Sequence, residues 1–116
     1  MTEIKNTLYA KYIYAKEGTE VIEDELGFYI YKVLGKECYI ADAYTVPEAR
    51  CSGQTRKRTE QLEKIAKARG CDFISAKIYI ADADASNTLM AALRIGFRIA
   101  TADARNLIIV KDIKGE

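Results

Sequence analysis

The chain contains no histidine and only one proline. Histidine is the commonest general base near neutral pH, so any proton transfer must use a carboxylate, a tyrosine, a cysteine, a lysine or water. The three cysteines are odd in number and lack C-x-x-C spacing, which argues against a disulfide framework and against a common zinc site. We therefore expect no metal site, and we expect the protein in the reducing cytoplasm.

Long apolar runs and an excess of one charge are also missing. No stretch approaches the roughly 20 apolar residues of a membrane span, and the polar start over residues 1–6 is unlike a signal peptide. The 18 basic and 17 acidic residues give a net charge of +1, so nothing attracts the chain in general to nucleic acid or to a membrane. Its 116 residues have the size and the composition of one soluble domain, which we expect to span residues 1–116.

The first half of the sequence predicts a short helix followed by an antiparallel meander. Asn6 or Thr7 could cap a helix that runs to Lys16, although the Tyr and Ile residues between Tyr9 and Tyr14 also fit a strand. Short turns then separate three predicted strands. These strands cover residues 20–24, 27–33 and 38–46.

The second half predicts helices that alternate with strands. Apolar residues at helical spacing indicate a helix over residues 54–69, which Gly70 ends. A strand with alternating apolar residues follows, then a second helix and a hairpin. These remaining elements are the strand over 73–80, the helix over 86–95, capped by Asp84 or Ser86 and ended by Gly96, and the hairpin strands over 97–102 and 107–113.

These elements predict an α/β (α+β) fold, in which helices pack on a mixed and mostly antiparallel sheet. The strand over residues 73–80 should place its alternating apolar side chains, up to Ile80, on one face. Exposed strand edges and the final hairpin leave room for a homodimer, although no residue specifies one. Four tyrosines are expected to pack within strands, namely Tyr29, Tyr31, Tyr39 and Tyr79.

The stretch VPEARCSGQT, over Val46–Thr55, lies between a predicted strand and a predicted helix. A chain that leaves the strand at Pro47 and enters the helix near Gln54 aims several backbone N–H groups at one place. The positive end of the helix dipole points to the same place. This arrangement suits a phosphate group.

The segment YIADAYTVPEARCSG, over Tyr39–Gly53, resembles the strand, turn and phosphate loop of GNAT N-acetyltransferases, whose pattern runs roughly V-x-P-E-x-R-x-x-G-x-G/A. LRIGF, over Leu93–Phe97, resembles the end of the last helix and the start of the following strand in the same fold. The order of elements agrees from about residue 20 to residue 113. The resemblance implies a GNAT-like sheet in which a bulge splays the strand before the turn from its neighbour.

The resemblance also implies a cofactor, acetyl-CoA or CoA. Backbone amides of Ala43 and Thr45 would bond the pantetheine arm, and amides of the loop and of the helix start would surround the pyrophosphate. The loop arginine, Arg50, either joins this site or pins the loop through carbonyl oxygens. The residues implied for the cofactor are Ala43, Thr45, Arg50, Cys51, Ser52, Gly53, Gln54 and Thr55.

The implied reaction is acetyl transfer to an amine, and it requires deprotonation of an ammonium with a pKa of about 10. The amine belongs to a small molecule or to a protein, and the sequence leaves its identity open. Asp42 and Tyr44 share one face of their strand if alternation holds. Asp42 would accept the proton directly or through water, and Tyr44 would orient the substrate or donate a proton. Asp42 is also consistent with an ordinary carboxylate that faces solvent or accepts N–H hydrogen bonds.

Several residues depart from the family pattern, three of them in ways that bear on function. Thr55 stands where a second Gly or Ala is usual, Arg58 stands where an apolar residue seats the helix, and Ala92 replaces the tyrosine that protonates the leaving thiolate. These departures favour an alternative, a non-catalytic GNAT-like domain with a protein-interaction or structural role. The basic cluster Arg56–Arg58 would meet the cofactor's phosphates, or at least one of its residues would lie on an exposed helix face. With Arg50 it would carry a weaker third alternative, nucleic-acid binding.

Overall fold

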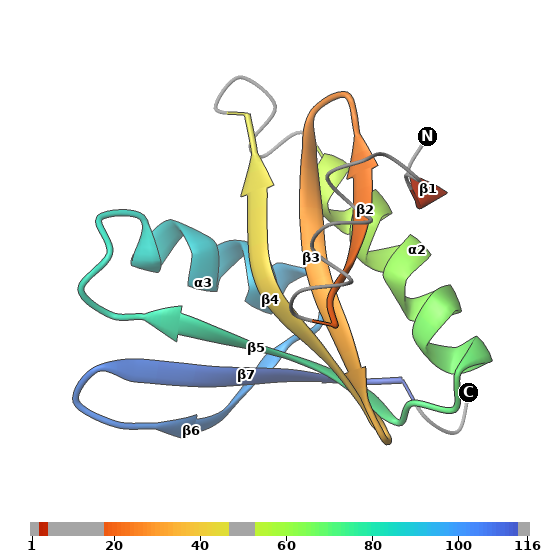
Figure 1. Cartoon of the computed structure of the whole chain (residues 1–116). Helices are drawn as coiled ribbons and strands as arrows, with labels where there is room; N and C mark the ends of the chain where they lie inside the picture. Colours follow the sequence, from red (N-terminus) through yellow and green to blue (C-terminus); the bar gives the residue numbers. More distant parts are fainter. Residues whose placement is uncertain (1–2, 5–17, 47–52, 114–116) are drawn as a thin grey trace.

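The computed structural model describes residues 3–4, 18–46 and 53–113 (Figure 1). The bounds of the described elements are β1 Glu3–Ile4, β2 Glu20–Asp24, β3 Gly27–Leu34, β4 Glu37–Thr45, α2 Gln54–Ala68, β5 Phe73–Tyr79, α3 Ala85–Arg94, β6 Arg98–Ala102 and β7 Asn106–Asp112. Every element predicted from residue 20 onward is confirmed to within one residue at each end, whereas β1 was not predicted. The helix predicted from Asn6 or Thr7 to Lys16 lies outside the described residues.

The strands form one sheet in the order β1-β2-β3-β4-β5-β7-β6. β4 and β5 are parallel, and every other neighbouring pair is antiparallel. The connection between the parallel strands contains α2, because parallel neighbours need a long crossover. The predicted mixed and mostly antiparallel sheet is therefore confirmed.

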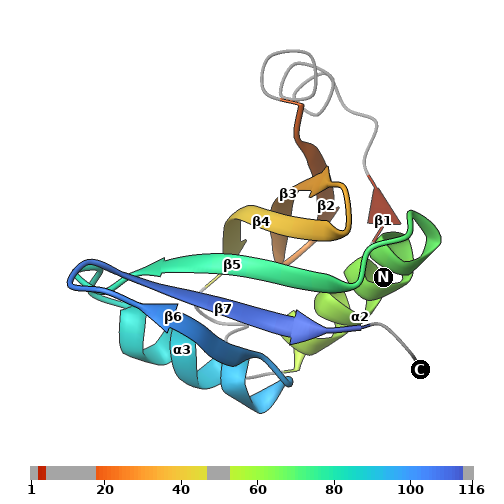
Figure 2. The same ribbon diagram turned by 90° about the horizontal axis from the view of Figure 1, so that it is seen from below.

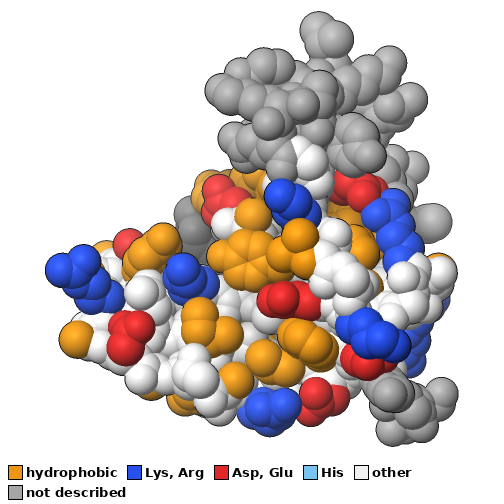
Figure 3. Space-filling view, turned by 60° about the horizontal axis from the view of Figure 1, so that its bottom comes forward, with side chains coloured by type: hydrophobic (Ala, Val, Ile, Leu, Met, Phe, Trp, Pro, Cys, Tyr) orange, Lys and Arg blue, Asp and Glu red, His pale blue; other side chains and the backbone are white. Residues whose placement is uncertain are grey.

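Both described helices lie on the same face of the sheet (Figures 1 and 2). Leu62 and Ala66 of α2 share one buried core with Ile74 and Ile78 of β5 and with Ala92 of α3. The two residues are four apart on each element, which places them on one side of the helix and, because four is even, on one face of the strand. Figure 3, which includes part of the opposite face, shows hydrophobic side chains interspersed with basic and acidic ones.

Glycines end both helices, as the sequence predicts. Gly70 has a φ of 83° and donates to the Lys67 carbonyl, and Gly96 has a φ of 105° and donates to the Leu93 carbonyl. Glycine adopts this left-handed backbone at little steric cost. Asp84 occupies the position before α3, but its side chain makes no capping hydrogen bond. Neither described helix is long and apolar enough to cross a membrane.

The alternating apolar pattern of the sequence runs to Ile80, one residue beyond the end of strand β5 in the structure. Ile74 and Ile78 are buried, but Ile80 follows the last strand residue and is 46% exposed. Its N–H donates to the Arg105 carbonyl at 2.9 Å, because the chain turns towards the β6–β7 connection there. Ile80 therefore lies beyond the buried part of this strand.

The predicted packing of tyrosines depends on where each strand has neighbours. Tyr29 and Tyr31 are buried in the middle of the sheet, and Tyr39 is half-buried. Tyr79 is 57% exposed, because it ends β5 beyond the part of that strand that pairs with β4. The packing predicted for Tyr79 was therefore wrong.

We expect the free energy of unfolding to fall as the pH rises above about 9. Burial raises the pKa of the Cys38 thiol from 9.0 to about 12, and it raises the pKa of Tyr31 above 10.0. The unfolded chain loses these protons first, so the stability they contribute is complete below about pH 9 and is lost as the pH approaches the folded-state values. Urea unfolding at about pH 8 and about pH 10 measures this effect. Cys38→Val should reduce the fall, and an unchanged midpoint would contradict the assignment.

Candidate functional site

The sheet divides between β4 and β5. Their parallel ladder joins Glu37–Ile40 to Phe73–Ala76 and ends there. Beyond it, β4 stays paired with β3 as far as Thr45, and β5 stays paired with β7 as far as Tyr79. The two strands visibly separate in Figure 1. We call this part of the sheet, formed by the last five residues of β4 and the last three of β5, the β4–β5 divergence.

A bulge in β4 marks the start of the β4–β5 divergence. Between Ile40 and Asp42 the pairing with β3 shifts by one residue, so Ala41 has no partner of its own on that strand. An extra residue of this kind bends its strand and increases the local twist. Burial changes at the same point, because Ile40 is buried and residues 41–44 are exposed. The bulge implied by the family resemblance is therefore confirmed.

Two backbone N–H groups of β4 point into the divergence. Val46 donates to the Leu26 carbonyl, in the β2–β3 turn, at 2.8 Å. Because successive N–H groups alternate sides along an extended strand, those of Ala43 and Thr45 point away from β3. The Ala43 N–H donates at 2.8 Å to the carboxylate of Asp42. A ligand that bonds Ala43 would have to replace this carboxylate.

Asp42 and Tyr44 lie on the side of β4 that faces away from the helices. They stand opposite Ile30 and Phe28 on β3, whereas Tyr29 between these two faces the buried core. Tyr44 is 45% exposed, and its ring centroid lies 5.9 Å from that of Phe28. The shared face predicted for Asp42 and Tyr44 is therefore confirmed, whereas their catalytic roles stay predictions.

The start of α2 faces the same region. Gly53 precedes the helix with a φ of 88°, which is a conformation that favours glycine. No side chain caps this end of α2, and no acidic residue lies in its first turn. A Cβ atom at Gly53 would meet nothing within 4 Å. The first N–H groups and the positive end of the helix dipole can therefore act on an anion.

Part of the predicted phosphate loop is not described. Arg50, Cys51 and Ser52 lie outside the described residues, and only the backbone of Gln54 is described. Thr55 is half-buried, and its hydroxyl oxygen lies 3.4 Å from that of Thr45. The hydroxyl of Thr55 therefore faces the end of β4.

Arg58 is fully buried. Its Nη2 lies 3.0 Å from Oδ1 of Asp24, and its Nη1 donates to Oγ1 of Thr45 at 3.1 Å. The guanidinium also lies 5.7 Å from the ring centroid of Tyr29. Burial raises the pKa of Tyr29, while its hydrogen bond with Thr59 and the charge of Arg58 act in the opposite direction. The prediction that Arg58 meets the cofactor's phosphates was wrong, because its charge is paired inside the protein.

The other residues of the basic cluster are placed differently. Arg56 and Lys57 are exposed. Arg56 donates through Nη2 to the Arg94 carbonyl, at the end of α3, at 2.9 Å. The three consecutive basic residues therefore do not form one basic surface, since one is buried and one connects the two helices.

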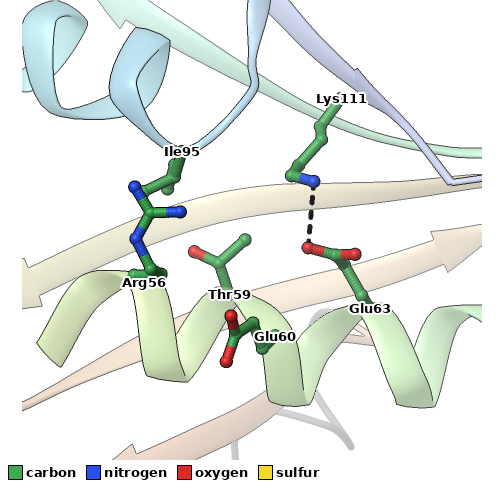
Figure 4. Close-up of a pocket in the computed structure, with 6 residues that line it drawn as sticks. All are labelled: Arg56, Thr59, Glu60, Glu63, Ile95 and Lys111. Carbon is green, nitrogen blue, oxygen red and sulfur yellow. Dashed lines mark ion pairs between the residues drawn. The ribbon is translucent and has the colours of Figure 1, made fainter. Parts of the chain in front are cut away.

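A small hollow of about 170 Å³ lies between α2, the end of α3 and β7 (Figure 4). Lys111 pairs with Glu63 across it at 3.1 Å, and Arg56 extends over it towards α3 (Figure 4). Because these charges are already engaged, the hollow belongs to the packing of α2 on α3 and β7. Its lining residues are Arg56, Thr59, Glu60, Glu63, Ile95 and Lys111.

The described site offers few groups for acid–base chemistry. Asp42 is exposed at the divergence, and Tyr44 and Tyr79 carry exposed rings near the ends of β4 and β5. Ala92, at the position where the resembling family has its tyrosine, is buried in the core. Within the described ranges, no group of three or more Cys, Asp and Glu residues could hold a metal ion. Carboxylate, phenol and water chemistry is what this arrangement can support.

This chain is similar to known proteins in its fold. No family model and no curated protein matches the chain. A GNAT-family protein of Desulfovibrio desulfuricans superposes with a TM-score of 0.76, at 11% identity, over 97% of this chain and 98% of that protein. The chain has the GNAT fold. The bulge in β4 and the β4–β5 divergence are features that the family resemblance had implied.

Two larger acetyltransferases share this GNAT fold. Nourseothricin acetyltransferase has a TM-score of 0.70 and 19% identity, over 82% of this chain. PaiA N-acetyltransferase from Thermoplasma acidophilum, solved in complex with coenzyme A, has a TM-score of 0.69 and 18% identity, over 81% of this chain. The matched parts are 64% of the first protein and 59% of the second. The chain thus spans less than two thirds of each.

Proposed function

We propose that this protein is an acetyl-CoA-dependent N-acetyltransferase that acts on an amine, either a small molecule or a protein. The observation that carries the proposal is that the bulged strand β4 diverges from β5 directly before the uncapped start of α2. Pantetheine would lie along the N–H groups of Ala43 and Thr45. The pyrophosphate would lie at the amides from Cys51 to Thr55 and near Arg50, where the helix dipole favours an anion.

The reaction joins the acceptor nitrogen to the acetyl carbonyl carbon and breaks the carbon–sulfur bond of the thioester. Asp42 would take the proton that the ammonium must lose before attack, directly or through water. Tyr44 would orient the acceptor or donate a proton. The leaving thiolate takes a proton from water or from a tyrosine, because Ala92 has none to give. Alignment of the two substrates supplies a large part of the rate.

One observation favours a second candidate, a GNAT-like domain without catalytic activity that serves in protein interaction or as a structural unit. Ala92 is a core residue, so the usual proton donor of the family is replaced by a methyl group that packs against the sheet. Such a domain either retains CoA as a bound ligand or lacks it. Cofactor binding and turnover must therefore be measured separately.

Calorimetric titration with acetyl-CoA, followed by an assay of CoA release with a panel of amines, separates these candidates. We expect wild-type protein to bind acetyl-CoA and to acetylate at least one amine. Asp42→Asn should keep the dissociation constant within about twofold and slow transfer by about 10²-fold or more, because only the proton acceptor is lost. Asp112→Asn, on the far strand β7, is the matched control and should change neither quantity.

Three outcomes decide between the candidates. Absence of binding heat at millimolar acetyl-CoA would contradict the proposed function. Binding without turnover on the panel would favour the non-catalytic domain. An unchanged rate in Asp42→Asn would remove Asp42 from the mechanism while leaving the transferase intact.

A further inference from the structure

We propose that the buried pair of Arg58 and Asp24 is a positioning device that holds the end of β4 against the first turn of α2. This inference rests on the proposed function in one respect, because the two segments it joins are those assigned to the pantetheine and to the pyrophosphate. Arg58 acts here through Thr45 and touches no substrate. It is therefore a positioning residue for cofactor binding.

The pair is enclosed and has well-defined geometry. The side chains of Arg58 and Asp24 are 0% and 3% exposed. Two guanidinium nitrogens contact the carboxylate, Nε at 3.2 Å from Oδ2 and Nη2 at 3.0 Å from Oδ1. The same carboxylate accepts the N–H of Leu26 at 2.8 Å. Asp24 therefore fixes both the guanidinium and the turn between β2 and β3.

The third guanidinium nitrogen of Arg58 connects the ion pair to the candidate site. Nη1 of Arg58 donates to the hydroxyl of Thr45, the residue whose own N–H points into the β4–β5 divergence. The Thr45 hydroxyl also faces that of Thr55 in the first turn of α2. One chain of contacts thus runs from the β2–β3 turn through the end of β4 to the start of the helix.

A second chain of hydrogen bonds connects the first turn of α2 to β3. Thr59 donates through Oγ1 to the Thr55 carbonyl at 2.8 Å, and the same oxygen lies 2.7 Å from the hydroxyl of Tyr29. Thr59 and Tyr29 are both buried. The first turn is therefore connected by polar side chains to β3 as well as to β4, and its orientation relative to the strands is specified.

Stability alone is a weak explanation for this pair. Replacing a buried ion pair by apolar side chains of similar volume is often neutral or stabilising, because the desolvation of two charges offsets much of their attraction. A hydrogen-bonded pair does fix directions that an apolar contact leaves loose. Arg58 stands where the GNAT pattern usually has an apolar residue, and it makes its directional bonds where β4 meets the helix. We therefore assign it to the geometry of the site.

The opposite end of α2 provides a matched comparison. Arg69 makes a bidentate pair with Glu20, so the same helix is also tied to the same strand, β2, at its far end. That pair is partly exposed, at 41% and 20% for the two side chains. It contacts neither Thr45 nor Thr55. Removing it should loosen the attachment of α2 without acting on the candidate site.

The test compares Asp24→Asn/Arg58→Met with Glu20→Gln/Arg69→Met. Asn at position 24 keeps an acceptor for the Leu26 N–H, and Met keeps most of the volume of Arg58 without its charge. Calorimetry with CoA gives the dissociation constant, and amide hydrogen exchange without ligand reports the opening of individual segments. Both measurements are made well below the midpoint of thermal unfolding of each variant.

We expect Asp24→Asn/Arg58→Met to bind CoA about tenfold more weakly or worse, because small displacements at a site have large effects. Exchange at Val46 and Lys57 should be faster, because their N–H groups donate to carbonyls that hold the end of β4 and the first turn of α2. Leu62 should be unchanged, and the control pair should leave Val46 and the CoA affinity as in wild type. Wild-type affinity and exchange in the folded double variant, or equal losses in the control, would overturn the inference. If wild-type protein binds no CoA, the proposed function fails, and exchange at Val46 alone decides whether the pair holds the end of β4.

Thr45→Val decides the question if the double variant does not fold. This change keeps the volume and the buried pair and removes only the hydroxyl that Arg58 and Thr55 contact. We expect faster exchange at Lys57, whose N–H closes the first turn of α2, and a severalfold loss of CoA affinity. A variant that matches wild type in both respects would overturn the inference.

Discussion

Asp24→Ala should destabilise the protein by about 3–5 kcal/mol. The substitution leaves the guanidinium of Arg58 buried and without its carboxylate, since Arg58 is 0% exposed and reaches Asp24 through two nitrogens. It also removes the acceptor of the Leu26 N–H in the β2–β3 turn. Urea unfolding followed by circular dichroism measures the loss as a change in midpoint at constant slope.

Asp112→Ala is the control for this prediction. Asp112 pairs with Arg98 at 3.2 Å, but both side chains are more than half exposed. Water screens an exposed pair and solvates the remaining charge, so the loss should stay below about 1 kcal/mol. A loss of similar size in both variants would show that Asp24 contributes no more than an ordinary surface carboxylate.

Gly27→Ala should prevent stable folding or displace the β2–β3 hairpin. A Cβ atom at this position would lie 2.0 Å from the Tyr44 carbonyl oxygen and 2.9 Å from both Cα of Thr45 and Nη2 of Arg58. Two of these neighbours are backbone atoms of the paired strand, so the clash cannot be relieved by a side-chain rotation. We expect a loss of more than about 3 kcal/mol, at the upper end for overpacking in a filled interior.

Gly35→Ala is the comparison for Gly27→Ala, because here the expected loss of stability comes from backbone strain and not from a steric clash. Gly35 has a φ of 62°, and a Cβ atom there would meet nothing within 4 Å. Its cost should be limited to the left-handed backbone, about 1 kcal/mol. Thermal unfolding of both variants compares them. A Gly27→Ala variant as stable as Gly35→Ala would mean that the β3–β4 contact is looser than described.

Local patterns predict most of the fold because they report on local structure. Alternation along β5 and helical spacing on α2 specify both elements to within one residue, and Gly70 and Gly96 end the helices where a positive φ is needed. Ile80 marks the limit of this reasoning. Its apolar character continues the alternation, but nothing in the sequence shows that the paired strand ends one residue earlier.

Arg58 shows why the site could be predicted only in part. Next to Arg56 and Lys57, it has the sequence appearance of an exposed basic surface. Its partner, Asp24, lies 34 residues earlier, on strand β2, and no local pattern links the two. The bulge at Ala41 was expected only through the family resemblance, because the periodicity of β4 carries no separate sign of an extra residue.

The sequence pattern and the structure bear on different parts of the proposed function. The pattern around Val46–Thr55 indicates a phosphate-binding turn, of which residues 47–52 lie outside the described structure. The structure instead provides the bulged strand, the β4–β5 divergence and the uncapped start of α2. Ala92 and the buried Arg58 show that this chain combines that architecture with side chains that differ from the family pattern.

Titration of ¹⁵N-labelled protein with CoA, followed by amide NMR, tests the central claim most directly. The account predicts saturable shifts at Ala43, Thr45 and Gly53–Thr55, with little change in β6 and β7, because the ligand would meet the N–H groups of the β4–β5 divergence and of the α2 start. Shifts confined to other parts of the chain, or no shifts at millimolar CoA, would contradict the assignment of this site to the cofactor.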